Sequence, residues 1–431
     1  MRSWLLLTVV LFSLCSFADL DRWQKWELER NDLHLNPQIY NQLPSAEELK
    51  MYQTETVLMV TVPLSSIGII ANGVDIELSD RMEQLLNAAG LLVHDKNLFE
   101  WKTYKKQVRF YIHPKAVHLF KNILSLGKVQ KVAVKPSTSP RSPFLIDKII
   151  KLSLPQAING AIRTVYPLQM KRATYISQIF ADAGTVDFLP EVLGVYDKTP
   201  GNPFGFIVRE IPTEFVIGKK TLVPLLSYVA EHPQGSLLSL NAKLLKSTPQ
   251  KLVQNRILPA LIKSFMAAAQ LGVAVEAHQQ NVLLELDEKG RFTGRIFFRD
   301  MDGCRVDFEL REKLGFKDER IKADPEFEWI FDIPKLQELN RTILPFRRNA
   351  FESLSFEKSN ESTFMANQKS KPIAWSGVIE KAWKTYLIGS SIHLLQQQVP
   401  QLNLSLIAEK QLRDRWIKNI GVAPMCGNIY K

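Results

Sequence analysis

Cysteine is scarce in this chain, and its scarcity excludes two classes of protein. The 431 residues include three cysteines, too few for a disulfide-rich scaffold or a multi-cysteine zinc array. The seven histidines are dispersed and lack the spacing of a zinc site. If Cys15 is set aside, Cys304 and Cys426 remain. The sequence allows either a disulfide between them or two buried free thiols.

The common nucleotide-binding and hydrolase motifs are also missing. There is no G-x-x-x-x-G-K-[ST], G-x-G-x-x-G, G-x-S-x-G or H-E-x-x-H, so P-loop, classical Rossmann, hydrolase-elbow and zincin interpretations lose their main support. The basic residues form no arginine-rich or aromatic-interleaved stripe, which disfavours nucleic acid as a partner. A net charge of +11 still favours anionic partners in general.

Long apolar runs are missing except at the N-terminus. Met1-Arg2-Ser3 is followed by an apolar run from Trp4 to Cys15 and by small residues at Ser16 and Ala18. This layout predicts a secretory signal peptide over residues 1–18 and an exported chain, periplasmic or secreted. The run is short for a membrane span, which needs about 20 residues. A retained anchor, a lipoprotein and a mispredicted signal in a cytoplasmic protein remain alternatives.

The remaining chain has the pattern of a globular α+β protein. A charged fraction of 23% beside 45% hydrophobic residues excludes global disorder. Strands are predicted at Val57–Pro63, Gln107–Ile112, Val129–Val134 and Lys148–Leu154, and a hairpin at Val282–Phe298. Helices are predicted at Ser79–Ala89, 115–127, Ala157–Tyr166 and Ile257–Leu271. Beyond Cys304 the pattern is mainly helical, with a loop at 356–372 and a long helix at 376–397.

Polar residues gather just before the predicted hairpin. Five of the six side chains of Glu276–Asn281 (E-A-H-Q-Q-N) are polar, although the flanking residues are apolar. A solvated turn is the simplest interpretation, because burying such groups without partners costs roughly 1–3 kcal/mol each. The far strand of the hairpin, however, ends in Arg299-Asp300, followed by Asp302. Because a hairpin brings its two ends together, we expect a site here.

A second group is cationic. Arg141 lies in the loop Ser139-Pro140-Arg141-Ser142, Lys151 on the following strand and Arg163 on the helix predicted after it. Three cations from consecutive elements could surround a polyphosphate, with the serine hydroxyls adding hydrogen bonds. Taken alone, each of these cations is more simply interpreted as a surface residue.

Taken in order, these segments resemble the IucA/IucC family of NRPS-independent siderophore synthetases. The middle segment of that family reads H-P-W, S-x-R-T, a strand lysine, T-S-A-x-R, E-a-H-x-Q-N and R-D. The counterparts are His113-Pro114, Ser139–Ser142, Lys151, Asn159–Arg163, Glu276–Asn281 and Arg299-Asp300. The resemblance covers roughly residues 105–310, and Glu276–Asn281 is its most specific part.

The resemblance implies a ligase of siderophore biosynthesis that uses ATP and Mg²⁺. Such an enzyme adenylates a polycarboxylate, citrate or similar, and condenses it with an amine or alcohol. We expect a small divergent N-terminal domain (19–104), an ATP- and carboxylate-binding core (105–310) and a helical C-terminal domain (311–431), with a central, mostly antiparallel sheet. The resemblance implies the cupped-hand shape of the family. A homodimer is left open.

The resemblance also implies roles for individual residues. Arg141, Arg163 and His278 are the expected catalytic residues, because departing pyrophosphate builds negative charge. The expected ATP-binding residues are Ser139, Arg141, Ser142, Lys151, Arg163, His278, Gln280 and Asn281. The expected carboxylate site is Asn159, Arg163 and His278. The expected Mg²⁺ ligands, which offer hard oxygen atoms, are Glu276, Asn281 and Asp300.

The chain departs from the family pattern at several positions. Ser142 occupies the position of the family's threonine, Asn159-Gly160 that of Thr-Ser and Lys115 that of tryptophan. The family's upstream G-H-P-x-H-P-x-x-K segment has no counterpart in this chain. Export also conflicts with the cytoplasmic supply of ATP. The alternative is therefore an exported, non-catalytic pseudo-synthetase that binds a siderophore or polycarboxylate. The retained set of charged and amide side chains favours the enzyme.

Overall fold

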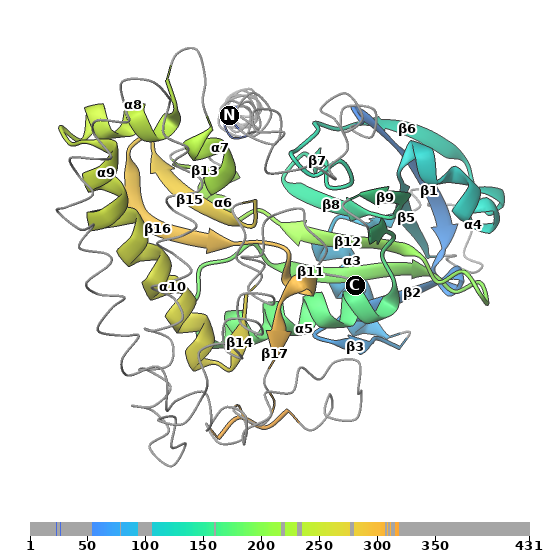
Figure 1. Cartoon of the computed structure of the whole chain (residues 1–431). Coiled ribbons are helices and arrows are strands. Elements are labelled where there is room, and N and C mark those ends of the chain that lie inside the picture. Colours follow the sequence, from blue (N-terminus) through green and yellow to red (C-terminus); the bar gives the residue numbers. More distant parts are fainter. Residues whose placement is uncertain are drawn as a thin grey trace, which may run out of the picture.

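The computed structural model shows how these segments fold (Figure 1). It describes residues 54–77, 79–93, 106–158, 161–216, 220–230, 235–275 and 280–306, with Trp23, Trp26, Phe308, Arg311 and 315–318. The predicted signal peptide, and every element predicted beyond Asp318, lie outside the described residues. Within the described part of the chain, no helix has the length and hydrophobicity needed to cross a bilayer.

The first sheet has four antiparallel strands in the order β4–β5–β1–β6. Its strands are β1 (Thr56–Pro63), β4 (Leu92–Val93), β5 (Gln107–Ile112) and β6 (Val129–Ala133). The helices that share its hydrophobic core are α3 (Asp80–Ala88), the 3-10 helix η3 (Pro114–Leu119) and α4 (Lys121–Ser125). Ser79 caps α3, because its hydroxyl accepts the N–H of Met82 at 3.4 Å.

The second sheet has six antiparallel strands in the order β3–β2–β11–β12–β8–β7. Its strands are β2 (Ile67–Ala71), β3 (Val74–Asp75), β7 (Phe144–Leu145), β8 (Lys148–Leu152), β11 (Glu191–Asp197) and β12 (Gly205–Glu210). The short helix η2 (Leu64–Ser66) carries the chain from β1 in the first sheet to β2 in the second. Residues 54–77 thus pair with strands beyond residue 105 in both sheets.

A third sheet, β13–β15–β16, contains the predicted hairpin. Its strands are β13 (Lys220–Pro224), β15 (Val282–Asp287) and β16 (Phe292–Phe298). The helices around it are α6 (Thr213–Val216), α7 (Leu225–Val229), α8 (Leu237–Leu244), α9 (Pro249–Leu252), the π-helix η4 (Val253–Ile257) and α10 (Leu258–Gln270). The helix α10 is the one predicted, and it is followed by Gly272 at φ +68°, as expected of a helix stop.

Two predicted helices differ from the structure. The segment Ala157–Tyr166 is not the start of a helix, because it forms the hairpin β9 (Leu154–Ile158) and β10 (Ala161–Arg163). The helix α5 (Pro167–Ala183) begins at the proline, which favours extended backbone in the residue before it. Arg163 therefore lies on a strand. The predicted helix 115–127 is interrupted at Phe120 (φ −118°, ψ 32°), which separates η3 from α4.

The six-stranded sheet lies between two hydrophobic cores. On one face, Ile150, Leu152 and Phe206 pack with the four-stranded sheet. On the other face, Ile207 packs with α5, α10 and the hairpin β15–β16. Because successive side chains of a strand point to opposite faces, Lys151 points toward the second face. The remaining short elements are η5 (Met301–Gly303) and the strand pair β14 (Val273–Ala274) and β17 (Arg305–Val306).

Candidate active site

A row of charged side chains crosses the second face of the six-stranded sheet. Lys151 on β8 pairs with Ile207, and Glu191 on β11 pairs with Arg209, two residues further along β12. With the period-two alternation of strands, all three charged residues share one face. Each is at most 2% exposed. Charges buried this deeply require partners.

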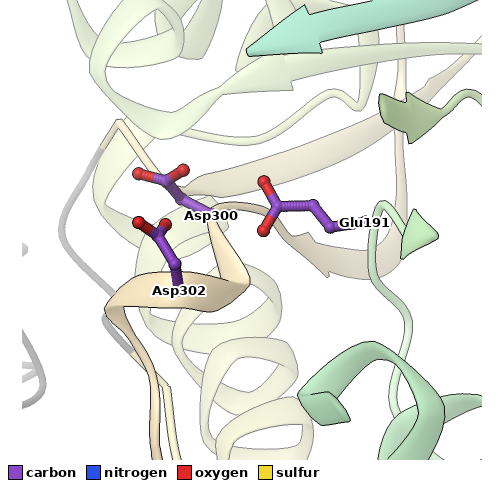
Figure 2. A group of neighbouring side chains, drawn as sticks. All are labelled: Glu191, Asp300 and Asp302. Carbon is purple, nitrogen blue, oxygen red and sulfur yellow. The ribbon is translucent and has the colours of Figure 1, made fainter. Parts of the chain in front are cut away.

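The end of β16 supplies two carboxylates to this row. The amide N–H of Arg299 donates to the carbonyl of Asn281 at 3.0 Å, which closes the end of the hairpin. Asp300 and Asp302 follow, and the Lys151 ammonium forms ion pairs with both. Figure 2 shows Asp300 and Asp302 side by side, with Glu191 approaching from β11. We call these four residues, together with Arg209, the charged cluster: Lys151, Glu191, Arg209, Asp300 and Asp302.

Arg209 and Glu191 lie on strands of the six-stranded sheet and contact the turn that carries the aspartates. Arg209 Nη2 contacts Glu191 Oε1 at 2.5 Å and Asp300 Oδ1 at 3.0 Å. The other oxygen of Glu191 accepts the N–H of Met301 at 3.0 Å, and Oε1 also lies 3.9 Å from Lys151 Nζ. Glu191 therefore connects the sheet to the turn that carries both aspartates.

The backbone of Asp300 is left-handed, with φ 72° and ψ 62°. Such a conformation is uncommon for residues other than glycine, although aspartate and asparagine tolerate it best. It persists where surrounding contacts over-determine it, typically at functional sites. Here it turns the chain directly after β16, where the Asp300 carboxylate meets Lys151 and Arg209.

The cluster shifts the pKa values of its members. Burial alone would raise the pKa of Asp300, but Lys151, Arg209 and Arg141 outweigh it and hold that pKa well below its usual range. Burial alone would lower the pKa of Lys151, but Asp300, Asp302 and Glu191 raise it above its ordinary value. Both groups are therefore charged at neutral pH.

The lowered pKa of Asp300 predicts how stability depends on pH. A carboxylate with a depressed pKa in the folded state stabilises the protein above the unfolded pKa, about 3.9. That contribution is lost as the pH falls through the folded pKa. We expect the free-energy difference between wild type and Asp300→Asn to be constant from pH 7 to about 5 and to shrink below about 4. Urea unfolding across this range measures it, and a difference unchanged at pH 3 would contradict the assignment.

The predicted serine–arginine loop lies beside the cluster. Its two ends are joined by reciprocal backbone hydrogen bonds between Lys135 and Phe144, at 3.0 and 2.8 Å. Within the loop, the Ser139 hydroxyl donates to Ser142 Oγ at 3.1 Å. From the hairpin, Arg299 Nη2 donates to Thr138 Oγ1 at 3.0 Å, and both residues are buried. The loop and the hairpin end are therefore held together, although 161 residues separate Thr138 from Arg299.

Arg141 connects the loop to the strand pair β9–β10. Its Nη1 donates to the carbonyl of Arg163 at 2.9 Å, and its own carbonyl accepts the N–H of Leu152 at 2.7 Å. Burial lowers the pKa of Arg141, while the nearby Asp302 and Asp300 act in the opposite direction. Arg141 thus lies near the cluster.

The structure brings together several of the residues that the sequence singled out. Lys151 contacts Asp300, Ser139 contacts Ser142, and Arg141 contacts the backbone of Arg163. Asn281 is buried at the hairpin end and Gln280, beside it, is half-buried. Three predicted site residues lie outside the described residues: Asn159, Glu276 and His278.

Two members of the cluster were not predicted, and Lys151 has unexpected contacts. Glu191 and Arg209 received no role in the sequence analysis. Their one available signal was a charge at the edge of an apolar strand, in E-V-L-G-V-Y and G-F-I-V-R-E. Lys151, which was expected to bind ATP, forms ion pairs with Asp300 and Asp302.

The carboxylates fit a hard cation. Oxygen atoms of Glu191, Asp300 and Asp302 lie within 4.8 Å of one another. The charged cluster pairs two cations with three carboxylates, and its hydrogen bonds to both aspartates use Oδ1. Oxygen ligands of this kind suit Mg²⁺. Of the three predicted Mg²⁺ ligands, Asp300 belongs to this trio.

Comparison with known proteins places the fold. Residues 254–352 match the family described as "Ferric iron reductase FhuF-like transporter", and no curated protein sequence matches the chain. Among solved structures, ATP-bound aerobactin synthetase IucA from a hypervirulent pathotype of Klebsiella pneumoniae matches 94% of this chain and 76% of its own length. The TM-score is 0.54 and the sequence identity 16%.

A second similar structure is the petrobactin biosynthesis protein AsbB from Bacillus anthracis str. Sterne. It matches 81% of this chain with a TM-score of 0.52 and 16% identity, and the chain spans 63% of its length. At this identity the likeness establishes the fold. The mixture of helices and antiparallel sheets agrees with the α+β prediction. The chain therefore has the fold of the siderophore synthetases that its motifs resemble.

Proposed function

We propose that this chain is an ATP-dependent ligase of siderophore biosynthesis. It activates a polycarboxylate, citrate or similar, as an acyl-adenylate and joins it to an amine or alcohol. The observation that carries the proposal is the charged cluster beside the serine–arginine loop, in a fold shared with an ATP-bound synthetase. The sequence motifs lead to the same region.

In the first half-reaction, a carboxylate oxygen of the acid attacks the α-phosphorus of ATP. The bond from that phosphorus to the bridging oxygen breaks, and pyrophosphate leaves with the electron pair. Arg141 and Lys151 supply positive charge to the departing group, and Ser139 and Ser142 supply hydroxyl donors. In the second half-reaction, the amine or alcohol attacks the acyl carbon, AMP leaves and the nucleophile loses a proton.

The remaining residues of the cluster orient these groups. Asp300 and Asp302 would hold Mg²⁺, which neutralises polyphosphate charge when bound. Arg209 and Glu191 keep both aspartates in position through their contacts with Asp300 and Met301. The Lys151 ammonium is buried and paired with the two aspartates, and Arg141 lies near enough to act on its pKa.

One observation favours the non-catalytic alternative, an exported protein that binds a siderophore or polycarboxylate. The two cations on the sheet face, Lys151 and Arg209, are already neutralised by ion pairs, so the cluster can serve structure without catalysis. The replacement of Thr-Ser by Asn159-Gly160 also removes two hydroxyls from the expected carboxylate site.

A pyrophosphate-release assay separates the two functions. The full chain is incubated with Mg-ATP, a panel of polycarboxylates that includes citrate, and hydroxylamine as the nucleophile. Pyrophosphate and a hydroxamate that appear only when the acid is present support the ligase. No turnover with any acid, together with calorimetric binding of citrate or a siderophore, supports the binding protein.

Export is a separate proposal, based on the sequence of residues 1–18. Sequencing the N-terminus of the mature protein tests it. A new N-terminus at Asp19 supports cleavage and export, whereas Met1 retained in soluble protein would exclude them and favour a cytoplasmic enzyme.

A further inference from the structure

Residues 106–146 contain no acidic side chain. The chain as a whole has 44 aspartates and glutamates in 431 residues, so a stretch of this length would ordinarily contain about four. It carries eight cations instead: Lys106, Arg109, Lys115, Lys121, Lys128, Lys131, Lys135 and Arg141. One-sided charge on this scale creates a field that selects anionic partners.

Most of these cations lie on one part of the surface. Five exposed lysines lie on or beside η3, α4 and β6, and we call this group the basic end: Lys115, Lys121, Lys128, Lys131 and Lys135. Lys121, Lys128 and Lys131 form no ion pair with any residue that the structure describes. Figure 1 shows α4 and β6 at the outer margin of the four-stranded sheet.

Exposed aliphatic side chains are interspersed with these lysines. Val117 on η3, Leu126 after α4 and Val129 at the start of β6 are 38%, 45% and 42% exposed. Strand β6 is the last in its sheet, so its outer edge has no neighbouring strand within the described structure. Lysines around exposed valine and leucine side chains are typical of a surface that binds a membrane. The cations contact anionic headgroups, and the aliphatic groups enter the interface.

Nucleic acid fits this surface less well. Binding of single strands relies on aromatic side chains that stack on bases. Among the described residues, the exposed large aromatics are Tyr166 and Phe316, and both lie outside residues 106–146. We propose that the basic end binds membranes that contain anionic phospholipids.

Apart from Lys135, which closes the serine–arginine loop, the proposed surface is separate from the charged cluster. The four-stranded sheet packs on one face of the six-stranded sheet, and Lys151 points to the opposite face. A chain attached through its basic end therefore leaves the cluster on the far side of the six-stranded sheet. Membrane binding does not depend on ligase activity, so each proposal is tested by itself.

The experiment measures sedimentation with vesicles of phosphatidylglycerol and phosphatidylcholine, compared with phosphatidylcholine alone. The test variant is Lys121→Gln, Lys128→Gln and Lys131→Gln in the full chain. Its matched control is Lys243→Gln, Lys246→Gln and Lys251→Gln, which removes the same charge from exposed lysines at α8 and α9. Because every protein retains the same N-terminus, any contribution of the apolar run is common to all.

We expect wild type to bind the anionic vesicles and the test variant to lose on the order of 10²-fold in partition coefficient. The control should stay within about threefold, and Leu126→Ser should weaken binding without any change of charge. Equal losses in the two triple variants would show that net charge alone drives binding, and would overturn the proposal. Wild type that binds both vesicles equally, or that retains an acidic protein or DNA and no vesicle, would overturn it as well.

Discussion

Glu191→Gln should lower the free energy of unfolding by about 3–5 kcal/mol, the usual cost of removing one partner from a buried ion pair. Glu191 is fully buried, contacts Arg209 at 2.5 Å and accepts the N–H of Met301. The amide keeps the shape of the side chain and removes its charge. Arg209 then lies in the protein interior with Asp300 as its remaining ion-pair partner. Urea unfolding followed by circular dichroism measures the loss.

Glu214→Gln is the matched control for this experiment. Glu214 also forms an ion pair with an arginine, Arg295, at 3.0 Å, but its side chain is 40% exposed. Exposed ion pairs contribute about 0–1 kcal/mol, so this variant should unfold close to wild type. Equal losses in the two variants would show that the charged cluster is no more important to stability than a surface pair.

Much of the fold could be predicted from the hydrophobic pattern. The strand at Gln107–Ile112 and the hairpin from Val282 to Phe298 have continuous apolar runs bounded by turn residues, and both formed as expected. The helix prediction for Ala157–Tyr166 was wrong because the spacing of its apolar residues also suits a short helix. The decisive residue was Pro167, which keeps Tyr166 extended and begins the helix itself.

The candidate site was harder to predict because its charges are paired across strands. Lys151 was noticeable as a cation within an apolar strand, and Asp300 because a hairpin returns its ends to one place. Glu191 and Arg209 meet only through the register of β11 against β12. A shift of one residue in that register would send either side chain to the opposite face. The register between two strands cannot be read from the sequence of either strand alone. Glu191 and Arg209 therefore could not have been assigned to the site.

Lys151→Met should lower kcat at least about 10²-fold in the proposed ligase reaction, the loss typical of removing one group that stabilises developing charge. The Lys151 ammonium is the buried cation on Asp300 and Asp302, beside the loop that carries Ser139 and Arg141. Methionine fills a similar volume without charge, so the effect is electrostatic. Pyrophosphate release at saturating ATP and acid measures kcat.

Lys148→Met provides the control, because Lys148 lies on the same strand and pairs with the half-exposed Asp147 at 3.1 Å. It should retain wild-type turnover. Lys151→Met also leaves Asp300 and Asp302 without their ammonium partner, so their affinity for Mn²⁺ without nucleotide should rise, which paramagnetic resonance detects. A folded Lys151→Met protein with wild-type turnover would remove this lysine from the reaction. Lost turnover with tighter Mn²⁺ binding would show that the site is intact and lacks only the charge of Lys151. A collapsed site would bind the metal more weakly.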